Sequence, residues 1–452
     1  MSYLARINYS LYDRYLFSVN GRVDGSSRFG GNNKYGFFPS GSVAWRISEE
    51  GFMEPVKAVI NNLKLRTSYG FTGNTEIGVY ESLATLGSNS WTIGNQLVSG
   101  FYPNRIPNPD LKWEKTGQFD IGFDLGLFNN RLRLTADYYY KKTTDLLYNV
   151  AIPSASGYDS MLKNIGSVQN KGYELSIESD NLSGAFSWTT AFNISFNRNK
   201  VLELGGETYK DVGTYDDHLK TSDIRRLIVG QPIGVFYGYR FDGIFQNEAE
   251  CAQQTSSPSP IGVGLRRYKD LNGDGKIDAT NDREILGDAN PKFFGGMTNT
   301  FAYKGFELNV FLQYSYGNKI FNYNAMELES PTGGQNVYQD LVNRWTPTNP
   351  SNEYQKATTN RNNIVSDRFI EDGSFLKLKT VSLSYSFPKL NWKHIGGLRL
   401  YVTGQNLLTW TKYRGYDPEV SYRGASTLEA GEDFGGYPQA RTFMFGIKLD
   451  IK

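Results

Sequence analysis

The chain has 452 residues, of which 15% are aromatic and 39% are hydrophobic in total, and this aromatic-rich but polar composition favours strands over helices. Its 48 basic and 46 acidic residues leave a net charge of +2, so no field of one sign is available to hold nucleic acid. Because Cys251 is the single cysteine, an internal disulfide and a cysteine-based zinc site are excluded. A transmembrane helix is not expected, since the sequence has no run of about 18 apolar residues.

Period-two alternation is the main structural signal. From Phe119 to Leu127 every second residue is apolar, and after a turn at Asn129-Asn130 the alternation resumes from Leu132 to Tyr140. Several such segments are about ten residues or longer. A tilted strand that crosses a bilayer needs about 9–11 residues, whereas soluble strands cluster near 5–6. Because the second face is often charged, the pattern favours an all-β transmembrane antiparallel barrel over a soluble β-sandwich.

About thirteen crossings are predicted when short turns alternate with long polar loops. They are residues 3–10, 15–24, 36–48, 62–72, 112–128, 131–152, 168–179, 185–197, 293–303, 305–321, 374–387, 398–412 and 442–451. The long loops, predicted to be extracellular, are 25–35, 73–111, 153–167, 198–292, 322–373 and 413–440. Strand-like pieces at 80–86 and 235–245 are assigned to β-structure within these loops. Since an odd number of antiparallel strands cannot close, the chain is expected to be part of a larger barrel.

A calcium-like motif lies in the 198–292 loop. Oxygen-bearing residues occur with the spacing of EF-hand positions 1, 3, 5, 7 and 9, with the obligatory glycine at 6; they are Asp270, Asn272, Asp274, Gly275, the carbonyl of Lys276, and Asp278. Position 12 is Asn281 instead of a bidentate glutamate, and Asp282 follows one residue late. We therefore expect one structural Ca²⁺ site with a Kd on the order of 10⁻⁴–10⁻³ M. The alternative is a metal-free Asp/Asn/Gly turn.

Other residues offer less chemistry. The sequence contains no GxSxG, HExxH or P-loop motif, so an enzyme is not expected. Trp91 and Trp345 fall in long predicted loops. Such residues either pack locally or form a platform for a sugar ring, a peptide or a partner protein, and their aromatic faces lead us to favour glycans as the substrate.

Ten segments in one order resemble the C-terminal half of SusC/RagA-type TonB-dependent outer-membrane transporters. They include Asn108-PDLKWE, Asn164-IGSVQNKGYE, Gln231-PIGVFYGYRFDGIF, Asp270-LNGDGKID, Ile370-EDGSFLKLKTVSLSYSFP and Leu398-RLYVTGQNLLTWTKYRGYDPE. The resemblance implies a barrel of about 22 strands in a Bacteroidetes-type outer membrane. It also implies a SusD-like surface lipoprotein as partner, energy supplied through TonB, and import of oligosaccharides or peptides.

This resemblance sets the expected domain organisation. Residues 1–452 would be the C-terminal part of the barrel, with about thirteen of the 22 strands and no plug domain, and 198–292 would be an elaborated extracellular loop. The alternative function is a non-transporting, calcium-dependent surface adhesin or binding protein with a β-rich body.

Overall fold

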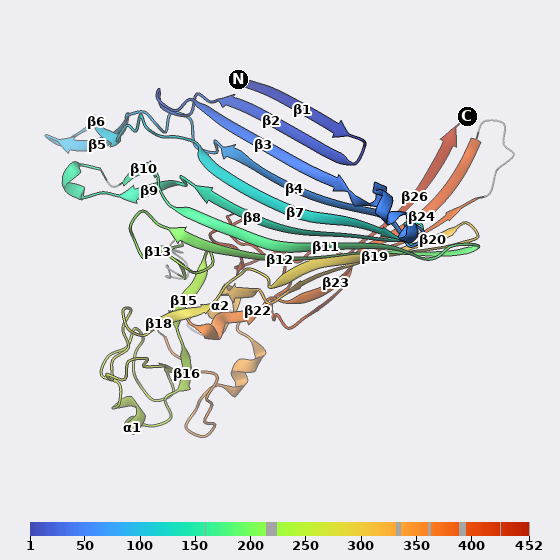
Figure 1. Ribbon diagram of the computed structural model, residues 1–452. Helices are drawn as coiled ribbons and strands as arrows, with labels where there is room; N and C mark the ends of the chain where they lie inside the picture. The colour runs from blue at the N-terminus through green and yellow to red at the C-terminus, as the bar shows by residue number, and fades with distance from the viewer. Residues whose placement is uncertain are drawn as a thin grey trace. The chain divides into compact units, whose positions relative to one another are not determined.

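Thirteen strands form one large antiparallel sheet. The computed structural model describes residues 1–158, 160–213, 224–330, 336–359, 363–387, 395–424 and 426–451. The sheet order is β1-β2-β3-β4-β7-β8-β11-β12-β19-β20-β23-β24-β26 (Figure 1). The bounds are β1 Ser2–Leu11, β2 Tyr15–Gly25, β3 Tyr35–Arg46, β4 Ile60–Asn74, β7 Glu114–Leu127, β8 Leu132–Thr144, β11 Ser167–Leu182, β12 Phe186–Glu203, β19 Phe293–Tyr303, β20 Phe306–Tyr316, β23 Phe375–Ser386, β24 Ile395–Thr411 and β26 Thr442–Ile451.

Each of the thirteen predicted crossings coincides with one of these strands, but two predicted spans are too long. The crossing predicted at 131–152 ends at Thr144, because Asp145 takes a left-handed conformation with a φ of 58° that interrupts the strand. The crossing predicted at 305–321 ends at Tyr316, where Gly317 has a φ of 89°. The alternation continues past both breaks, so sequence periodicity did not reveal them. In addition, β12 reaches Glu203 and extends into the predicted 198–292 loop.

Smaller elements fill the segments between the long strands. The strands are β5 Thr85–Ile93, β6 Gln96–Arg105, β9 Leu147–Ala151, β10 Ser160–Asn164, β13 Tyr209–Val212, β14 Arg225–Ile228, β15 Val235–Tyr239, β16 Phe241–Ile244, β17 Arg266–Tyr268, β18 Arg283–Gly287, β21 Lys319–Asn322, β22 Ile370–Asp372 and β25 Glu432–Asp433. The helices are α1 Glu248–Cys251, α2 Tyr323–Leu328 and the 3₁₀ turns Ile47–Glu49, Gly51–Val56, Ser154–Ser156, Gln339–Asn343 and Asp367–Phe369. None of the described helices is long and apolar enough to cross a membrane.

The strand-like piece predicted at 235–245 forms β15 and β16, and both strands lie outside the large sheet, as predicted. The piece predicted at 80–86 is displaced, because the observed hairpin of β5 and β6 runs from Thr85 to Arg105.

Tight turns connect several long strands. Phe128, Asn129 and Asn130 between β7 and β8 have φ values of 52°, 58° and 58°, and Lys304 and Gly305 between β19 and β20 have φ values of 45° and 87°. Successive left-handed residues match the right-handed twist of a hairpin, and Asn and Gly tolerate this conformation best. These local turns set the register of the paired strands.

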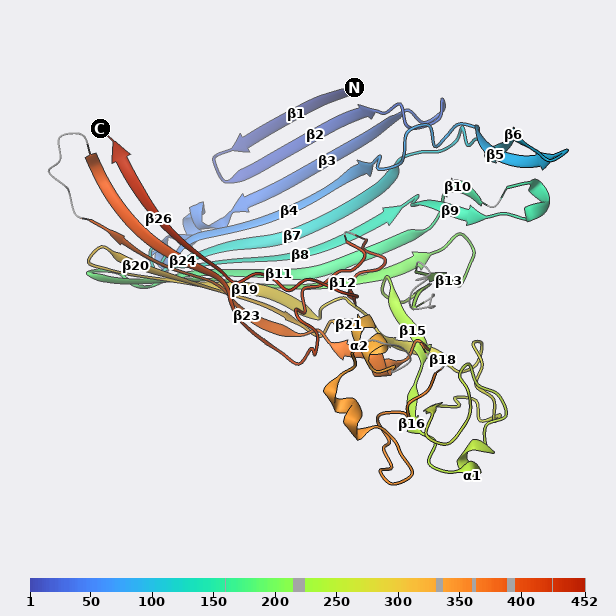
Figure 2. The same cartoon turned by 180° about the vertical axis from the view of Figure 1, so that it is seen from behind.

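The chain divides into two compact units. Unit 1 comprises Met1–Ser179 and Asn197–Thr208, and unit 2 comprises Asp180–Phe196 and Tyr209–Lys452. In unit 1 the hairpin of β5 and β6 extends past the ends of β3 and β4 (Figure 1). In unit 2 a buried hydrophobic cluster lies among the short elements, where β15, β21 and α2 come together (Figure 2). Its buried members are Ile224, Phe236, Phe321, Tyr323, Ala325, Met326, Val365 and Phe369.

Candidate functional site

The long strands of unit 1 have one apolar and one polar face. On β7 the side chains of Phe119, Ile121 and Phe123 remain 36%, 39% and 37% exposed although they are large and apolar. Asp120 and Asp124 alternate with them and accept hydrogen bonds from Ser and Thr hydroxyls of neighbouring strands. Exposed apolar groups on one face and hydrogen-bonded charges on the other are what a strand in a bilayer-spanning barrel presents.

Charges on the polar face are neutralised by ion pairs that join strands. The Arg66 guanidinium on β4 lies 2.7 Å from a carboxylate oxygen of Asp137 on β8 and 3.4 Å from one of Asp124 on β7. Lys64 adds a weaker contact of 3.8 Å to Asp124. Cavities of about 270 and 440 Å³ open beside this network, and Ser68 and Asp120 line both. The polar face therefore offers charged and hydroxyl groups to a solute.

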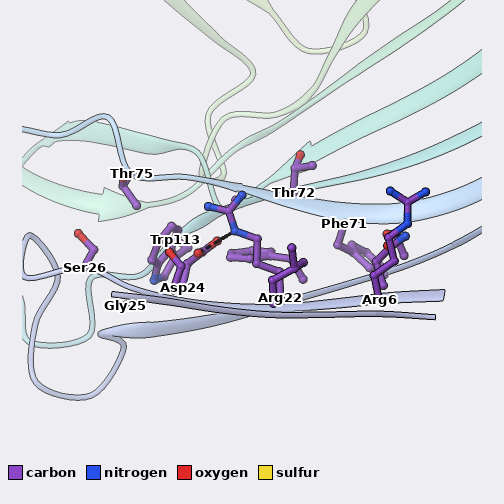
Figure 3. Close-up of a pocket in the computed structure, with 15 residues that line it drawn as sticks. Arg6, Arg22, Asp24, Gly25, Ser26, Phe71, Thr72, Thr75 and Trp113 are labelled. Atoms are coloured by element: carbon purple, nitrogen blue, oxygen red, sulfur yellow. Dashed lines mark hydrogen bonds and ion pairs between the residues drawn. The ribbon is translucent and has the colours of Figure 1, made fainter. Parts of the chain in front are cut away.

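A larger cavity of about 620 Å³ opens on this face near the ends of β2 and β4 (Figure 3). Its polar lining includes Arg6, Asn20, Arg22 and Asp24, and its aromatic lining includes Trp113. A volume of 300–1,000 Å³ with a few placed polar groups is typical of a small-molecule site. The quoted segment Asn108-PDLKWE includes Trp113, but no motif marks Arg6, Asn20 or Arg22, because charged residues alternate along many strands of this chain.

The aromatic floor of this cavity depends on two glycines. Trp113 packs between Phe29 and Phe38, with ring centroids 5.2 and 5.4 Å away. A Cβ atom at Gly36 or Gly73 would come within 2.5 or 2.1 Å of the Phe38 ring, so only glycine lets the ring lie against the strands. The buried Nε1 of Trp113 has no hydrogen-bond partner among the residues that the structure describes.

The predicted calcium ligands of unit 2 lie in one loop, where they bind backbone amides. The Asp270 carboxylate accepts bonds of 2.6 and 2.7 Å from the amides of Gly273 and Gly275, and Asp274 accepts one of 2.8 Å from Lys276. Asn272 accepts a bond from the Asp274 amide and donates one to its carboxylate. These bonds curl the chain as the sequence motif requires.

At the end of this loop a carboxylate again accepts hydrogen bonds from backbone amides. Asp282 is completely buried, and its two carboxylate oxygens accept bonds of 2.8 Å from the amides of Leu271 and Asp278. The amides of Asn281 and Thr280 lower the pKa of the Asp278 carboxyl. Within the described ranges, which include all of 270–282, no three His, Cys, Asp or Glu side chains are placed to hold a metal ion.

The two loop tryptophans have different surroundings. Trp345 is half-buried in unit 2, where its Nε1 donates a 3.0 Å bond to Gln246 and its ring covers Gly264. Trp91 of unit 1 is 43% exposed on the hairpin of β5 and β6 and covers Gly100. Local packing therefore describes Trp345, whereas Trp91 leaves part of its ring accessible.

Sequence reasoning missed a buried ion pair in unit 2. Arg225 Nε lies 2.9 Å from Glu432 Oε1, and both side chains are 1% exposed. The guanidinium also donates to the carbonyls of Gly234 and Ala430 and covers the Phe236 ring at 4.2 Å. Burial raises the pKa of the Glu432 carboxyl, against the opposing effect of Arg225. No local signal reveals this pair, because its members are 207 positions apart.

A second buried cluster surrounds Glu329, which is 1% exposed. Arg368 and Arg414 approach its carboxylate at 2.7 and 3.1 Å, and Arg266 lies 3.9 Å away. Arg414 also pairs with Glu371 at 2.8 Å. These contacts join four segments of unit 2, around residues 266, 329, 368–371 and 414, that are far apart in the sequence.

Comparison with known proteins identifies relatives of this arrangement. The sequence profile of the family described as "TonB dependent receptor-like, beta-barrel" matches residues 2–244, which is more than half of the chain. TonB-dependent receptor P3 of Formosa agariphila is 41% identical over 99% of this chain and 45% of its own length. TonB-dependent receptor SusC of Bacteroides thetaiotaomicron is 32% identical over 100% of this chain and 44% of its own length.

A solved structure has a similar fold. The RagAB peptide transporter is 28% identical and superimposes with a TM-score of 0.83, over 99% of this chain and 47% of that chain. The chain thus spans about half the length of the curated relatives and of the solved structure that it matches.

Proposed function

We propose, from the premise that the chain belongs to the family of TonB-dependent receptor-like β-barrels of the outer membrane, that it supplies part of the wall of a SusC/RagA-type importer for oligosaccharides or peptides. The observation that carries this proposal is the division of the strands into an apolar face and a polar face with ion pairs and cavities. A polar face of this kind gives a solute a hydrated path with hydrogen-bonding partners.

The partners follow from the same premise. A SusD-like surface lipoprotein would cover the extracellular side, and TonB would supply energy. Similarity to SusC and to the RagAB peptide transporter supports both partners. The buried clusters around Arg225 and Glu329 give the segments of unit 2 fixed surfaces that such a lipoprotein could contact.

A deletion strain tests the function. We expect loss of growth on at least one class of nutrient when a panel of glycans and peptides is offered as carbon or nitrogen source, and restoration by the intact gene. Fractionation tests the location, since a barrel protein requires detergent and migrates differently after heating. Growth identical to the parent on every nutrient would contradict import, and a protein soluble without detergent would favour the adhesin alternative.

Calcium binding by the loop at 270–282 is a second proposal. Its support is the ligand spacing together with the left-handed Gly275, whose φ of 77° allows the sharp turn at position 6. Asp270, Asn272, Asp274, Asp278 and the carbonyl of Lys276 would supply oxygens, and Asp282 or water would complete the shell. The ion would hold the loop in one shape and supply no chemistry to a reaction.

Calorimetry on the detergent-purified protein tests this site. Millimolar Ca²⁺ is expected to bind the wild type and to bind Asp270→Ala and Asp274→Ala at least about tenfold more weakly. Asp340→Ala, an exposed aspartate in the 3₁₀ turn at 339–343, is the matched control. Equal binding by all variants would mean that the motif is a metal-free turn.

A further inference from the structure

Two arginines occupy neighbouring positions in the cavity of Figure 3. The register of β1 and β2 pairs Arg6 with Asn20, so Arg22 is the diagonal neighbour of Arg6 on the same face. Diagonal positions of an antiparallel pair lie about 7–8 Å apart, which long side chains can span. Arg6 is tied toward Asn8 and Arg22 toward Asp24, so the two guanidinium groups lean in opposite directions along the strands and present two separate points of positive charge (Figure 3).

Each arginine is held by its inner nitrogen. Arg6 Nε donates a 3.0 Å bond to Asn8 Oδ1, and Arg22 Nε donates a 2.8 Å bond to Asp24 Oδ1, in both cases to the second residue along its own strand. These bonds fix the side chains and do not use the terminal nitrogens. In Figure 3 both guanidinium groups stand away from the strands that carry them. Paired terminal nitrogens are suited to a carboxylate or sulfate, which they bind in a bidentate manner.

The lining of the cavity carries a net positive charge. Among the lining residues Arg6 and Arg22 are cationic and Asp24 is anionic, so two positive charges less one negative charge leave a formal excess of one positive charge. Asp24 is the one carboxylate that pairs with either arginine among the described residues. An anionic ligand would neutralise this excess, and a neutral ligand would not.

The rest of the lining suits a sugar ring. Trp113 and Phe38 supply aromatic surface. Asn20, Ser40 and Thr72 supply an amide and hydroxyls that can bond to ring hydroxyls. An aromatic face beside several neutral polar groups matches a ring with hydroxyl substituents better than it matches the amides of a peptide backbone.

We propose that this cavity is a subsite for acidic sugar units, whose carboxylates or sulfates are bound at two separate points by Arg6 and Arg22 while a sugar ring lies against the aromatic floor. The inference rests on the proposed import function and narrows its substrate class to anionic oligosaccharides. It also assigns the selection of charge to two strand residues that no motif marks.

Binding measurements on the protein purified from outer membranes in detergent test the subsite. The probes are an oligogalacturonate, a sulfated galactan oligosaccharide and a neutral malto-oligosaccharide of equal length, with an acidic peptide as a fourth probe. We expect at least one acidic sugar to bind about tenfold or more tightly than the neutral one, and the difference to shrink at high salt because the contact is electrostatic. Tighter binding of the oligogalacturonate would identify the bound anion as a carboxylate, and tighter binding of the sulfated galactan oligosaccharide would identify it as a sulfate.

Variants assign the effect to the two arginines. Arg6→Gln and Arg22→Gln are each expected to weaken binding of the acidic sugar by about tenfold or more, with little change for the neutral one. Arg6→Lys should restore part of the loss, since it keeps the charge without the bidentate geometry. The matched control is Arg133→Gln, which removes an arginine of β8 that pairs with Glu178 of β11, outside this cavity. Heat-dependent migration would show that every variant is folded.

Three results would overturn the proposal: equal affinity for acidic and neutral sugars, unchanged binding in both glutamine variants, or tighter binding of the acidic peptide than of either acidic sugar. The proposed import function is judged separately by growth of the deletion strain. A strain that loses growth on neutral glycans or peptides while the acidic sugars fail to bind would preserve the transporter and refute the subsite.

Discussion

The long strands and the intervening segments of unit 2 use large apolar residues in opposite ways. On β20 Phe306 is 52% exposed, whereas Phe236, Phe321 and Phe369 in the segments between long strands are 0% exposed. An apolar strand face in a bilayer is covered by lipid, but a segment in water has to bury its apolar groups against itself. Unit 2 therefore contains apolar side chains covered by lipid and apolar side chains buried within the protein. The same substitution should lower stability more in the second region than in the first.

Removal of a buried ring should have the largest effect. Phe321→Ala leaves a cavity in the cluster of unit 2 and is expected to destabilise these segments by about 3–5 kcal/mol. Phe306→Ala on the exposed strand face is the matched control, with little effect in detergent. Hydrogen exchange of the segments between long strands measures the loss. Similar exchange in both variants would contradict the contrast between the two regions.

Breaking the buried ion pair should have the next largest effect. Arg225→Met leaves the buried Glu432 with only the more distant of its two described ion-pair contacts, Arg423 at 3.6 Å, and is expected to cost about 3 kcal/mol. Arg399 and Glu307 form an ion pair on the long strands at 2.6 Å, but their side chains are 40% and 43% exposed. Arg399→Met should therefore cost about 1 kcal/mol or less. Thermal unfolding of both variants, monitored by the rate at which the segments are proteolysed, would show whether burial explains the difference in stability loss between Arg225→Met and Arg399→Met.

The attachment of the segment at 413–424 should depend on pH. Burial alone would raise the pKa of Glu419, but Lys377 and Lys379, at 2.6 and 3.0 Å, together lower it below its usual 4.5. A lowered carboxyl pKa contributes stability that is present above 4.5 and is lost as the pH falls through the folded value. We expect faster proteolysis of this segment in acid, and Glu419→Gln should remove that dependence. A pH dependence unchanged in Glu419→Gln would assign it to another group.

The loop tryptophans should show the smallest effects on stability. Trp345→Phe loses the bond to Gln246 and should cost about 1 kcal/mol, whereas Trp91→Ala on the exposed hairpin should cost about 0.5 kcal/mol or less. Because Trp91 contributes so little to folding, a defect in uptake or lipoprotein association in Trp91→Ala would indicate direct contact. Normal uptake and association in Trp91→Ala would contradict direct contact by Trp91.

The large sheet was predictable because its signal is local. Alternation with period two reports which face each residue occupies, and all thirteen strands follow it. The errors occur where a backbone break interrupts an alternation that continues, as at Asp145 and Gly317. The buried cluster of unit 2 was not predictable, since Phe236 and Phe321 meet only after distant segments fold together.

The candidate sites also differ in whether their residues are close in the sequence or come from different strands. The loop at 270–282 was predicted to be one turn because all its ligands are close in sequence, and the structure confirms the turn while calcium binding stays a prediction. The arginine pair was not predicted, because Arg6 and Arg22 become neighbours only through the register of two strands. Alternation indicates the face of each arginine and leaves its partner across the strands undetermined.

The two-residue turn between β19 and β20 constrains how this protein can evolve. Lys304 and Gly305 fix the register that places Tyr303 opposite Phe306. A single inserted residue there would move every later side chain of β20 to the opposite face, exchanging lipid-covered rings for amides and carboxylates. Insertions of many residues between the other strand ends leave the pairing intact. Variation in length should therefore accumulate at one end of the strands, while the end with the tight turns keeps a constant length across related genes.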